Sequence, residues 1–320
     1  MDRQELRFRA GDASLAATLT LPDAEGRLPW VLLVPSWLPR DRDGGWDRAG
    51  HRGWFAPPTR RSGGPLARLA DALAERGVAS LRYDPRGCGV SDGDWPSTGL
   101  FTRIDDARDA IGAMRSRPEL DLRRTAIVGH GEGAGIALSV AIGDPAIGAI
   151  GLVGATARSL RTVLRRGTAM RAARGVDREH PIVAALDDRI EELIERTDRG
   201  EASMPLEVAG VSIALELAGW DQGFHTPPIA LATMLHRSIV MLHGADDAWA
   251  DPDEARLLIG ALQDAGNEPA FTVVEGAGHD LVEAEDAVIG DFAGALVSRM
   301  EPRELPPVLV AIEEMGGPGR

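Results

Sequence analysis

The sequence predicts an α/β fold: a mostly parallel sheet with helices on both faces and a helical cap inserted between two strands. Three observations support this prediction. Short apolar runs alternate with amphipathic helical patterns along most of the chain. Several runs are apolar throughout, which is typical of strands buried on both faces. Between residues 154 and 237 the alternation stops, and three helix-like stretches follow one another.

The first half of the chain is expected to begin with a hairpin and then to alternate strands and helices. Strands over residues 6–8 and 14–21 are joined by a turn at Gly11 and Asp12. The elements expected next are strands over residues 30–34, 78–83, 125–128 and 147–153, and helices over residues 66–76, 101–116 and 134–141.

The second half is expected to contain the cap and the end of the sheet. The expected elements are cap helices over residues 159–171, 181–196 and 207–219, strands over 238–242 and 270–274, and helices over 252–263 and 284–299. Residues 1–154 and 238–299 would then form the core, and residues 155–237 the helical cap. The tail at 300–320 contains a stretch, 307–315, that either forms a short docking helix or stays loose.

The charge of the chain restricts its partners and its chemistry. The 320 residues are enough for one large or two small domains. Acidic residues outnumber basic residues, 49 to 35, which gives a net charge of −14. This balance argues against nucleic acids and anionic membranes as partners. All basic residues are arginine, so mechanisms that need a lysine Schiff base are excluded.

Cysteine content and hydropathy favour a cytoplasmic protein. Cys88 is the sole cysteine, so no disulfide can form within the chain. The first residues lack the charged-then-apolar pattern of a secretory signal. No apolar run approaches the roughly 20 residues that span a bilayer. We therefore expect no membrane contact and a small molecule as the partner, with self-association left open.

The strongest motif lies where a predicted strand turns into a helix. A buried strand ends at Gly-His-Gly-Glu-Gly, residues 129–133, and a helical pattern follows. A sharp strand-to-helix turn of this kind is typical of a nucleophile elbow, whose pattern is Gly-x-Ser-x-Gly. Gly131 stands at the position of the serine. The frame of the motif is kept, and its nucleophile is missing.

Two further motifs follow later strands in the order that a catalytic triad of this type requires. Gly-Ala-Asp-Asp at 244–247 comes after one strand, and Asp247 is the candidate acid, with Asp246 as the fallback. Gly-Ala-Gly-His at 276–279 comes after the last strand, and His279 is the candidate base. The order elbow, acid, histidine is that of the fold in which the elbow occurs.

These motifs resemble those of bacterial α/β-hydrolases related to dienelactone hydrolases and small acyl hydrolases. Asp-Arg-Asp-Gly at 41–44 and Asp-Pro-Arg-Gly-Cys-Gly-Val-Ser at 84–91 are similar to loops of that group, as is the elbow. The resemblance covers about residues 5–299. It departs at Gly131, where the group has serine, and after the third strand, where the group has His-Gly and this chain has Pro-Ser.

The resemblance implies an acyl hydrolase without its serine. The oxyanion hole would consist of the backbone N–H of Glu132 and that of Trp37 or Ser36. Asp247 would orient His279 as in a triad. Because a glycine cannot form an acyl-enzyme, His279 would activate a water directly. The expected substrate is a small ester, lactone or thioester, and no metal or cofactor is expected.

Other interpretations stay open. The His–Asp base could serve lyase, isomerase or cofactor-free oxygenase chemistry. The chain could be an inactive pseudo-hydrolase that binds an apolar ligand or a partner protein, or an engineered inactive variant. Cys88 has no visible base nearby, so we interpret it as a small buried thiol rather than a replacement nucleophile. The same caution applies to Ser36.

Tryptophans after strand ends either line an apolar pocket, because ligands bind at the carboxyl ends of parallel strands, or fix the cap to the core. The candidate pocket residues are Ser36, Trp220 and Trp249, and the expected ligand is an apolar acyl or aromatic compound. The cap also has an arginine-rich stretch, interpreted as a solvated face paired with acids. It contains Arg158, Arg161, Arg165, Arg166, Arg171 and Arg174.

Overall fold

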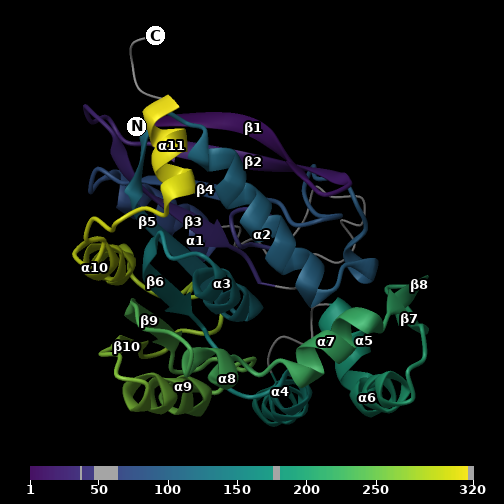
Figure 1. Cartoon of the computed structure of the whole chain (residues 1–320). Coiled ribbons are helices and arrows are strands. Elements are labelled where there is room, and N and C mark those ends of the chain that lie inside the picture. The colour runs from purple at the N-terminus through teal and green to yellow at the C-terminus, as the bar shows by residue number, and fades with distance from the viewer. Residues whose placement is uncertain (37, 47–63, 176–180, 316–320) are drawn as a thin grey trace.

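A twisted sheet forms the centre of the molecule (Figure 1). The computed structural model describes residues 1–36, 38–46, 64–175 and 181–315. Within these ranges the sheet has eight strands: β1 (Asp2–Ala10), β2 (Ala13–Leu21), β3 (Leu28–Val34), β4 (Ala79–Tyr83), β5 (Leu120–His130), β6 (Ile147–Val153), β9 (Ser238–Gly244) and β10 (Ala270–Val274).

The strand order is β1-β2-β4-β3-β5-β6-β9-β10. The β1–β2 and β2–β4 pairs are antiparallel. Every further pair along the order, from β4–β3 to β9–β10, is parallel. The prediction of a hairpin followed by a mostly parallel sheet is confirmed.

Helices cover both faces of the sheet, as predicted. α1 (Pro65–Ala74) and α10 (Asp286–Val297) pack on one face. On the other face lie α2 (Leu100–Arg115), α3 (Glu132–Gly143) and α9 (Pro252–Asp264). Neighbouring side chains of β3 pack on opposite faces of the sheet, since Leu32 belongs to the apolar cluster on one face and Leu33 to the cluster on the other. This double burial explains the uninterrupted apolar run of the strand.

The segment between β6 and β9 was predicted to be helical throughout, but it also contains two strands. It contains α4 (Leu160–Arg174), α5 (Pro181–Asp188), α6 (Ile190–Asp198), the strands β7 (Ser203–Val208) and β8 (Val211–Glu216), α7 (Ala218–His225) and α8 (Pro228–Ala232). The single helix predicted over residues 181–196 is divided at Arg189, whose φ of −127° lies outside the helical range.

The prediction of a helix over residues 207–219 is wrong, because most of this stretch belongs to the antiparallel β7–β8 hairpin. In β7, Leu206 and Val208 are buried and their neighbours are not, which is the two-residue period of a strand. Ala209 and Gly210 form the turn with φ of 49° and 79°, as tight hairpin turns require. The usual Asn-Gly signal is missing, and packing of the hairpin on α5 and α6 overrides the local helix propensity.

The chain beyond α10 docks on the core through a short helix. α11 (Pro307–Met315) follows an extended stretch, and Leu305 and Leu309 pack against Leu122 and Ala146. Of the two expected outcomes for this stretch, the docking helix is the one found. In the ranges described, none of the helices combines the length and the apolar composition needed to cross a bilayer.

One edge of the sheet gathers the candidate site residues. The strands β3, β5, β6, β9 and β10 are adjacent in the strand order and parallel to one another, and all end at this edge. Ser36, Gly131, Gly154, Asp247 and His279 follow the ends of these strands in the same order. Parallel pairing therefore brings together residues that are far apart in the chain.

Candidate active site

His279 and Asp247 form a hydrogen-bonded pair at this edge. His279 Nδ1 lies 2.8 Å from Asp247 Oδ2, and Asp247 is fully buried. The other carboxylate oxygen accepts the backbone N–H groups of Trp249 and Ala250 at 2.7 and 2.8 Å. These two bonds aim the carboxylate at the imidazole. Asp246, the fallback acid, is exposed, so the structure places Asp247 as the partner of His279.

Gly131 lies at the sharp turn between β5 and α3. Its φ of 57° and ψ of −121° are a conformation that glycine adopts far more readily than other residues. A Cβ atom on Gly131 would lie 2.9 Å from His279 Nε2 and 2.5 Å from Ser36 Oγ. The side-chain position at 131 therefore faces the imidazole nitrogen that does not contact Asp247, and the Ser36 hydroxyl borders the same space.

Of the predicted oxyanion donors, the structure describes Glu132 and the alternative Ser36, which borders the space next to position 131. Glu132 is the first residue of α3, and the N–H groups of the first helical turn have no acceptor within the helix. Its carboxylate accepts a hydrogen bond from Arg103 Nη1 at 2.7 Å. Trp37 lies outside the described residues. The Glu132 N–H is thus available to polarise a carbonyl group held next to position 131.

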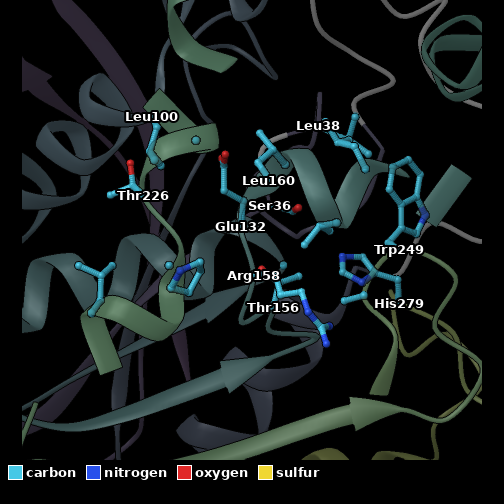
Figure 2. A pocket seen from close by; sticks show the side chains of 18 of the residues that line it. Ser36, Leu38, Leu100, Glu132, Thr156, Arg158, Leu160, Thr226, Trp249 and His279 are labelled. Carbon is cyan, nitrogen blue, oxygen red and sulfur yellow. The ribbon is translucent and has the colours of Figure 1, made fainter. Parts of the chain in front are cut away.

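A pocket with a volume of about 70 Å³ opens beside His279 (Figure 2). Ser36, Trp249 and Gly131 line it together with His279. Trp220 instead lines a neighbouring hollow. Much of the remaining wall is apolar and comes largely from the segment between β6 and β9. It includes Leu100, Leu160, Val163, Leu164, Pro228 and Leu231.

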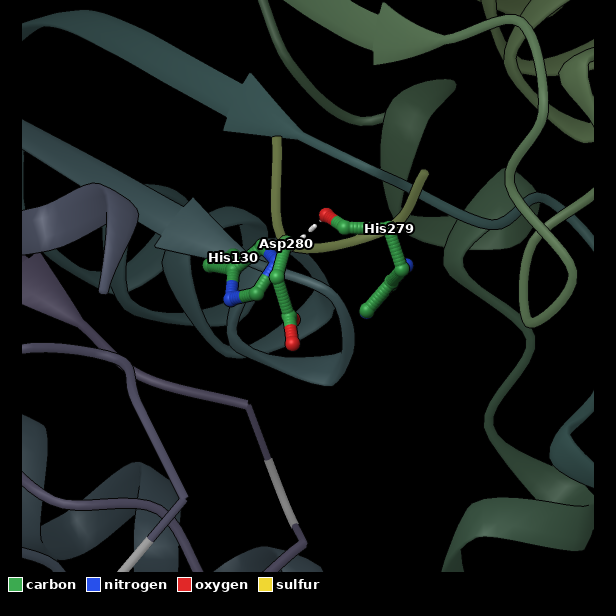
Figure 3. A group of neighbouring side chains, drawn as sticks. All are labelled: His130, His279 and Asp280. Carbon is green, nitrogen blue, oxygen red and sulfur yellow. Dashed lines mark hydrogen bonds and ion pairs between the residues drawn. The ribbon is translucent and has the colours of Figure 1, made fainter. Parts of the chain in front are cut away.

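A buried polar network supports the loop that carries His279, and sequence analysis missed it. His130 Nε2 donates to the His279 carbonyl oxygen at 3.0 Å (Figure 3). The two rings lie 4.7 Å apart. Next to them, Asp280 accepts a hydrogen bond from Arg40 Nη1 at 2.8 Å. Arg40 is 1% exposed, so this ion pair is a structural part of the site.

His130, His279 and Asp280 lie close enough together to be considered as metal ligands. The charges around them do not favour a divalent ion. The Arg40 guanidinium already neutralises Asp280, the sole carboxylate of the three. A metal ion would also be repelled by that guanidinium at close range. We interpret the cluster as a support for the His279 loop.

A model of the alpha/beta hydrolase family matches residues 31–291. This chain belongs to the alpha/beta hydrolase family. A search among curated proteins found no match for this hydrolase-family chain.

Solved structures share the fold of this alpha/beta hydrolase at low sequence identity. The esterase domain of a Rhodothermus marinus protein is 16% identical at a TM-score of 0.60, and the match covers 94% of this chain and 100% of that one. Est1E from Butyrivibrio proteoclasticus, in a structure with ferulic acid bound, is 14% identical at a TM-score of 0.63. The match covers 92% of this chain and 99% of that one. The acylaminoacyl peptidase of Pyrococcus horikoshii is 14% identical at a TM-score of 0.63. The match covers 97% of this chain and 44% of that one. At these identities the likeness shows a shared fold.

Two further residues of this alpha/beta hydrolase hold the dyad, and sequence analysis did not identify them. Gly154 lies against the imidazole, since a Cβ atom on it would be 3.0 Å from His279 Cε1. His243 is buried, and its Nε2 donates to the Ala250 carbonyl at 2.7 Å and lies 3.4 Å from Asp247 Oδ2. No local motif marks either residue. Gly154 follows β6 and contacts His279 from the loop after β10, whereas His243 contacts residues of the loop that follows its own strand, β9.

Arg171 is an exception to the solvated face predicted for the arginine-rich stretch, in which the exposed Arg165 pairs with Glu191 as expected. The Arg171 side chain is 1% exposed. It donates to Asp187 at 2.9 Å and to the Ala248 carbonyl at 3.2 Å. Its guanidinium also lies 3.9 Å from the centre of the Trp249 ring. Arg171 therefore ties α4 of this hydrolase to the loop that carries Asp247.

The dyad is electrostatically coupled. Burial lowers the pKa of His279, but the Asp247 carboxylate raises it, and the resulting pKa lies above the ordinary histidine value of 6.5. Burial raises the pKa of Asp247, but His279 opposes this, and the net pKa lies below the ordinary value. Burial, together with repulsion from His279, lowers the pKa of His130 to about 4. At neutral pH this hydrolase therefore has an ionised Asp247 and a neutral His130.

Proposed function

We propose that this protein hydrolyses small esters, lactones or thioesters, with His279 as the general base and Asp247 as its orienting acid. The observation that carries the proposal is the 2.8 Å bond between His279 Nδ1 and Asp247 Oδ2, with Nε2 directed to the side-chain position of Gly131. A general base must lie within hydrogen-bond reach of the proton it removes. An attacking oxygen beside Gly131 meets this condition.

In the proposed reaction, His279 Nε2 takes the proton of the attacking O–H group while its oxygen adds to the carbonyl carbon. Negative charge develops on the carbonyl oxygen, where the N–H of Glu132 stabilises it. The ionised Asp247 stabilises the imidazolium that forms. His279 then returns the proton to the leaving group, and the acyl product is released.

The pocket supports an apolar acyl group of small size. An ordered water needs a cavity of at least about 10–15 Å³, so 70 Å³ accommodates several waters or a short acyl chain. The esterase domain from Rhodothermus marinus and the ferulic acid complex of Est1E are in keeping with acyl chemistry on this fold. We also propose that the protein is related to dienelactone hydrolases and that it acts in the cytoplasm.

Replacing His279 by alanine is expected to lower the hydrolysis of small p-nitrophenyl esters about 1,000-fold or more, because the base is lost. His225→Ala is the matched control, since His225 also pairs with an aspartate, at 3.3 Å, but on the exposed face of α7. Turnover that survives His279→Ala would contradict the proposal. A native protein that binds such esters, seen as a raised melting temperature, without turning them over would instead be a binding protein.

Activity is expected to fall on acidification, with a midpoint above pH 6.5. Only neutral His279 can accept a proton, and the Asp247 carboxylate holds the pKa of His279 above that value despite burial. The rate constant kcat/KM should therefore be high at alkaline pH and decline as His279 becomes protonated. The measurement is a kcat/KM profile for an uncharged ester, with the fold monitored at each pH. A midpoint well below pH 6 would show that another group limits the rate.

A further inference from the structure

The space beside Gly131 is shared by two reactive side chains. Ser36 Oγ lies 2.5 Å, and His279 Nε2 2.9 Å, from the point where a Cβ atom on Gly131 would stand; Ser36 Cβ follows at 3.1 Å. These are the three heavy atoms nearest to that point. Two polar atoms that border the same small space can be joined through one water, and a base can activate a hydroxyl over that span.

The backbone brings Ser36 to this place. β3 ends at Val34, two residues before Ser36. A Cβ atom on Gly133, in the first turn of α3, would lie 2.5 Å from the Val34 carbonyl oxygen and 2.6 Å from that of Pro35. The end of β3 therefore packs backbone to backbone on the helix that begins at the elbow. Ser36 is 5% exposed, and it lines the same pocket as His279 (Figure 2).

The two departures from the motifs of the family, Gly131 in the elbow and Ser36 in the loop after β3, are sterically complementary. A serine at position 131 would have its Cβ atom within 2.5 Å of Ser36 Oγ, and non-bonded heavy atoms do not approach so closely. A serine at 131 and the present Ser36 rotamer are thus mutually exclusive. The glycine at 131 makes room for the hydroxyl at 36.

We propose that Ser36 is the nucleophile of this enzyme, delivered from the loop after β3 in place of the elbow serine. The inference deepens the proposed acyl hydrolysis and rests on it for its substrate class. It replaces direct attack by water with a covalent route through a triad of Ser36, His279 and Asp247. The sequence shows no base near Ser36, but in the folded chain His279 borders the same space.

The chemistry takes place in two balanced steps. Ser36 Oγ forms a bond to the carbonyl carbon while its proton passes to His279 Nε2, and collapse of the tetrahedral adduct expels the leaving group with that proton. The acyl–Ser36 ester is then attacked by water, whose proton His279 accepts. The carboxylic acid leaves as His279 returns the proton to Ser36 Oγ. No oxidant, reductant or cofactor is required.

The test maps a covalent label. The native protein is treated with an alkyl fluorophosphonate, which forms a phosphonyl ester with an activated serine and releases fluoride, and the site is read by peptide mass mapping. We expect the label on Ser36, its loss in Ser36→Ala, labelling at least 100-fold slower in His279→Ala, and an unchanged label in Ser298→Ala. Ser298 is a distant exposed hydroxyl that donates to the Ala295 carbonyl. In the double variant Gly131→Ser with Ser36→Gly, the label should move to residue 131.

The outcomes separate this inference from the proposed function. No adduct on Ser36 in folded native protein overturns the inference, whether or not esters are turned over. If turnover then still depends on His279, the proposed function stands with water as the attacking group. An adduct on Ser36 without ester turnover supports the nucleophile and rejects the substrate class. If the melting curve shows that Ser36→Ala does not fold, peptide mapping of the labelled native protein still shows whether Ser36 carries the adduct.

Discussion

Asp247→Asn is expected to lower kcat for ester hydrolysis by about 10,000-fold. The asparagine carbonyl would keep the two backbone N–H bonds now accepted by Asp247 Oδ1, which turns its NH₂ group towards His279. An imidazole that accepts a hydrogen bond at Nδ1 carries its proton on Nε2, so it cannot take a proton from the nucleophile. Changing the acid of a serine-protease triad in this way has an effect of that size.

Asp246→Asn is the matched control for this experiment. The two acids are adjacent in the chain, but Asp246 is exposed and Asp247 is fully buried. We expect Asp246→Asn to change kcat less than about threefold, since surface substitutions away from such networks have small effects. Comparable losses in the two variants would mean that the carboxylate facing His279 does not orient it.

Gly129→Ala is expected to destabilise the fold by about 3 kcal/mol or more, at the upper end of what overpacking costs. A Cβ atom on Gly129 would lie 2.0 Å from the carbonyl oxygen of Gly133 and 2.5 Å from the backbone N of Ala134. These are backbone atoms of the first turn of α3, which cannot rotate away as a side chain can. The free energy of unfolding, from urea denaturation followed by circular dichroism, measures the effect.

Gly135→Ala on the same helix tests whether the effect belongs to the position or to the substitution. The nearest atom to a Cβ there would be Pro228 Cγ at 3.5 Å, an ordinary contact. Alanine also favours a helix interior over glycine by roughly 0.5–1 kcal/mol. We therefore expect Gly135→Ala to be neutral or slightly stabilising. A Gly129→Ala variant as stable as the native protein would show that the elbow can open without cost.

The sequence by itself determined the α/β class, the parallel order of strands and helices, and the place of the elbow. These features depend on local patterns: uninterrupted apolar runs for strands buried on both faces, and glycines at a tight turn. The same local reasoning placed Asp247 and His279 on loops that follow strands, and parallel strands must end at a common edge. It could therefore predict that they meet near Gly131.

Other features were decided only by the tertiary structure. The hairpin of β7 and β8 has residues with helical preference, and its packing on α5 and α6 determines its conformation. The sequence favoured Asp247 over Asp246, but only the fold shows that the Asp247 side chain turns inward after β9. The closeness of Ser36 to His279, and the hydrogen bond from His130 to the His279 carbonyl, arise only in the folded sheet. Such contacts leave no periodic or motif signal in a single chain, because they join segments that are distant in sequence and adjacent only in the folded sheet.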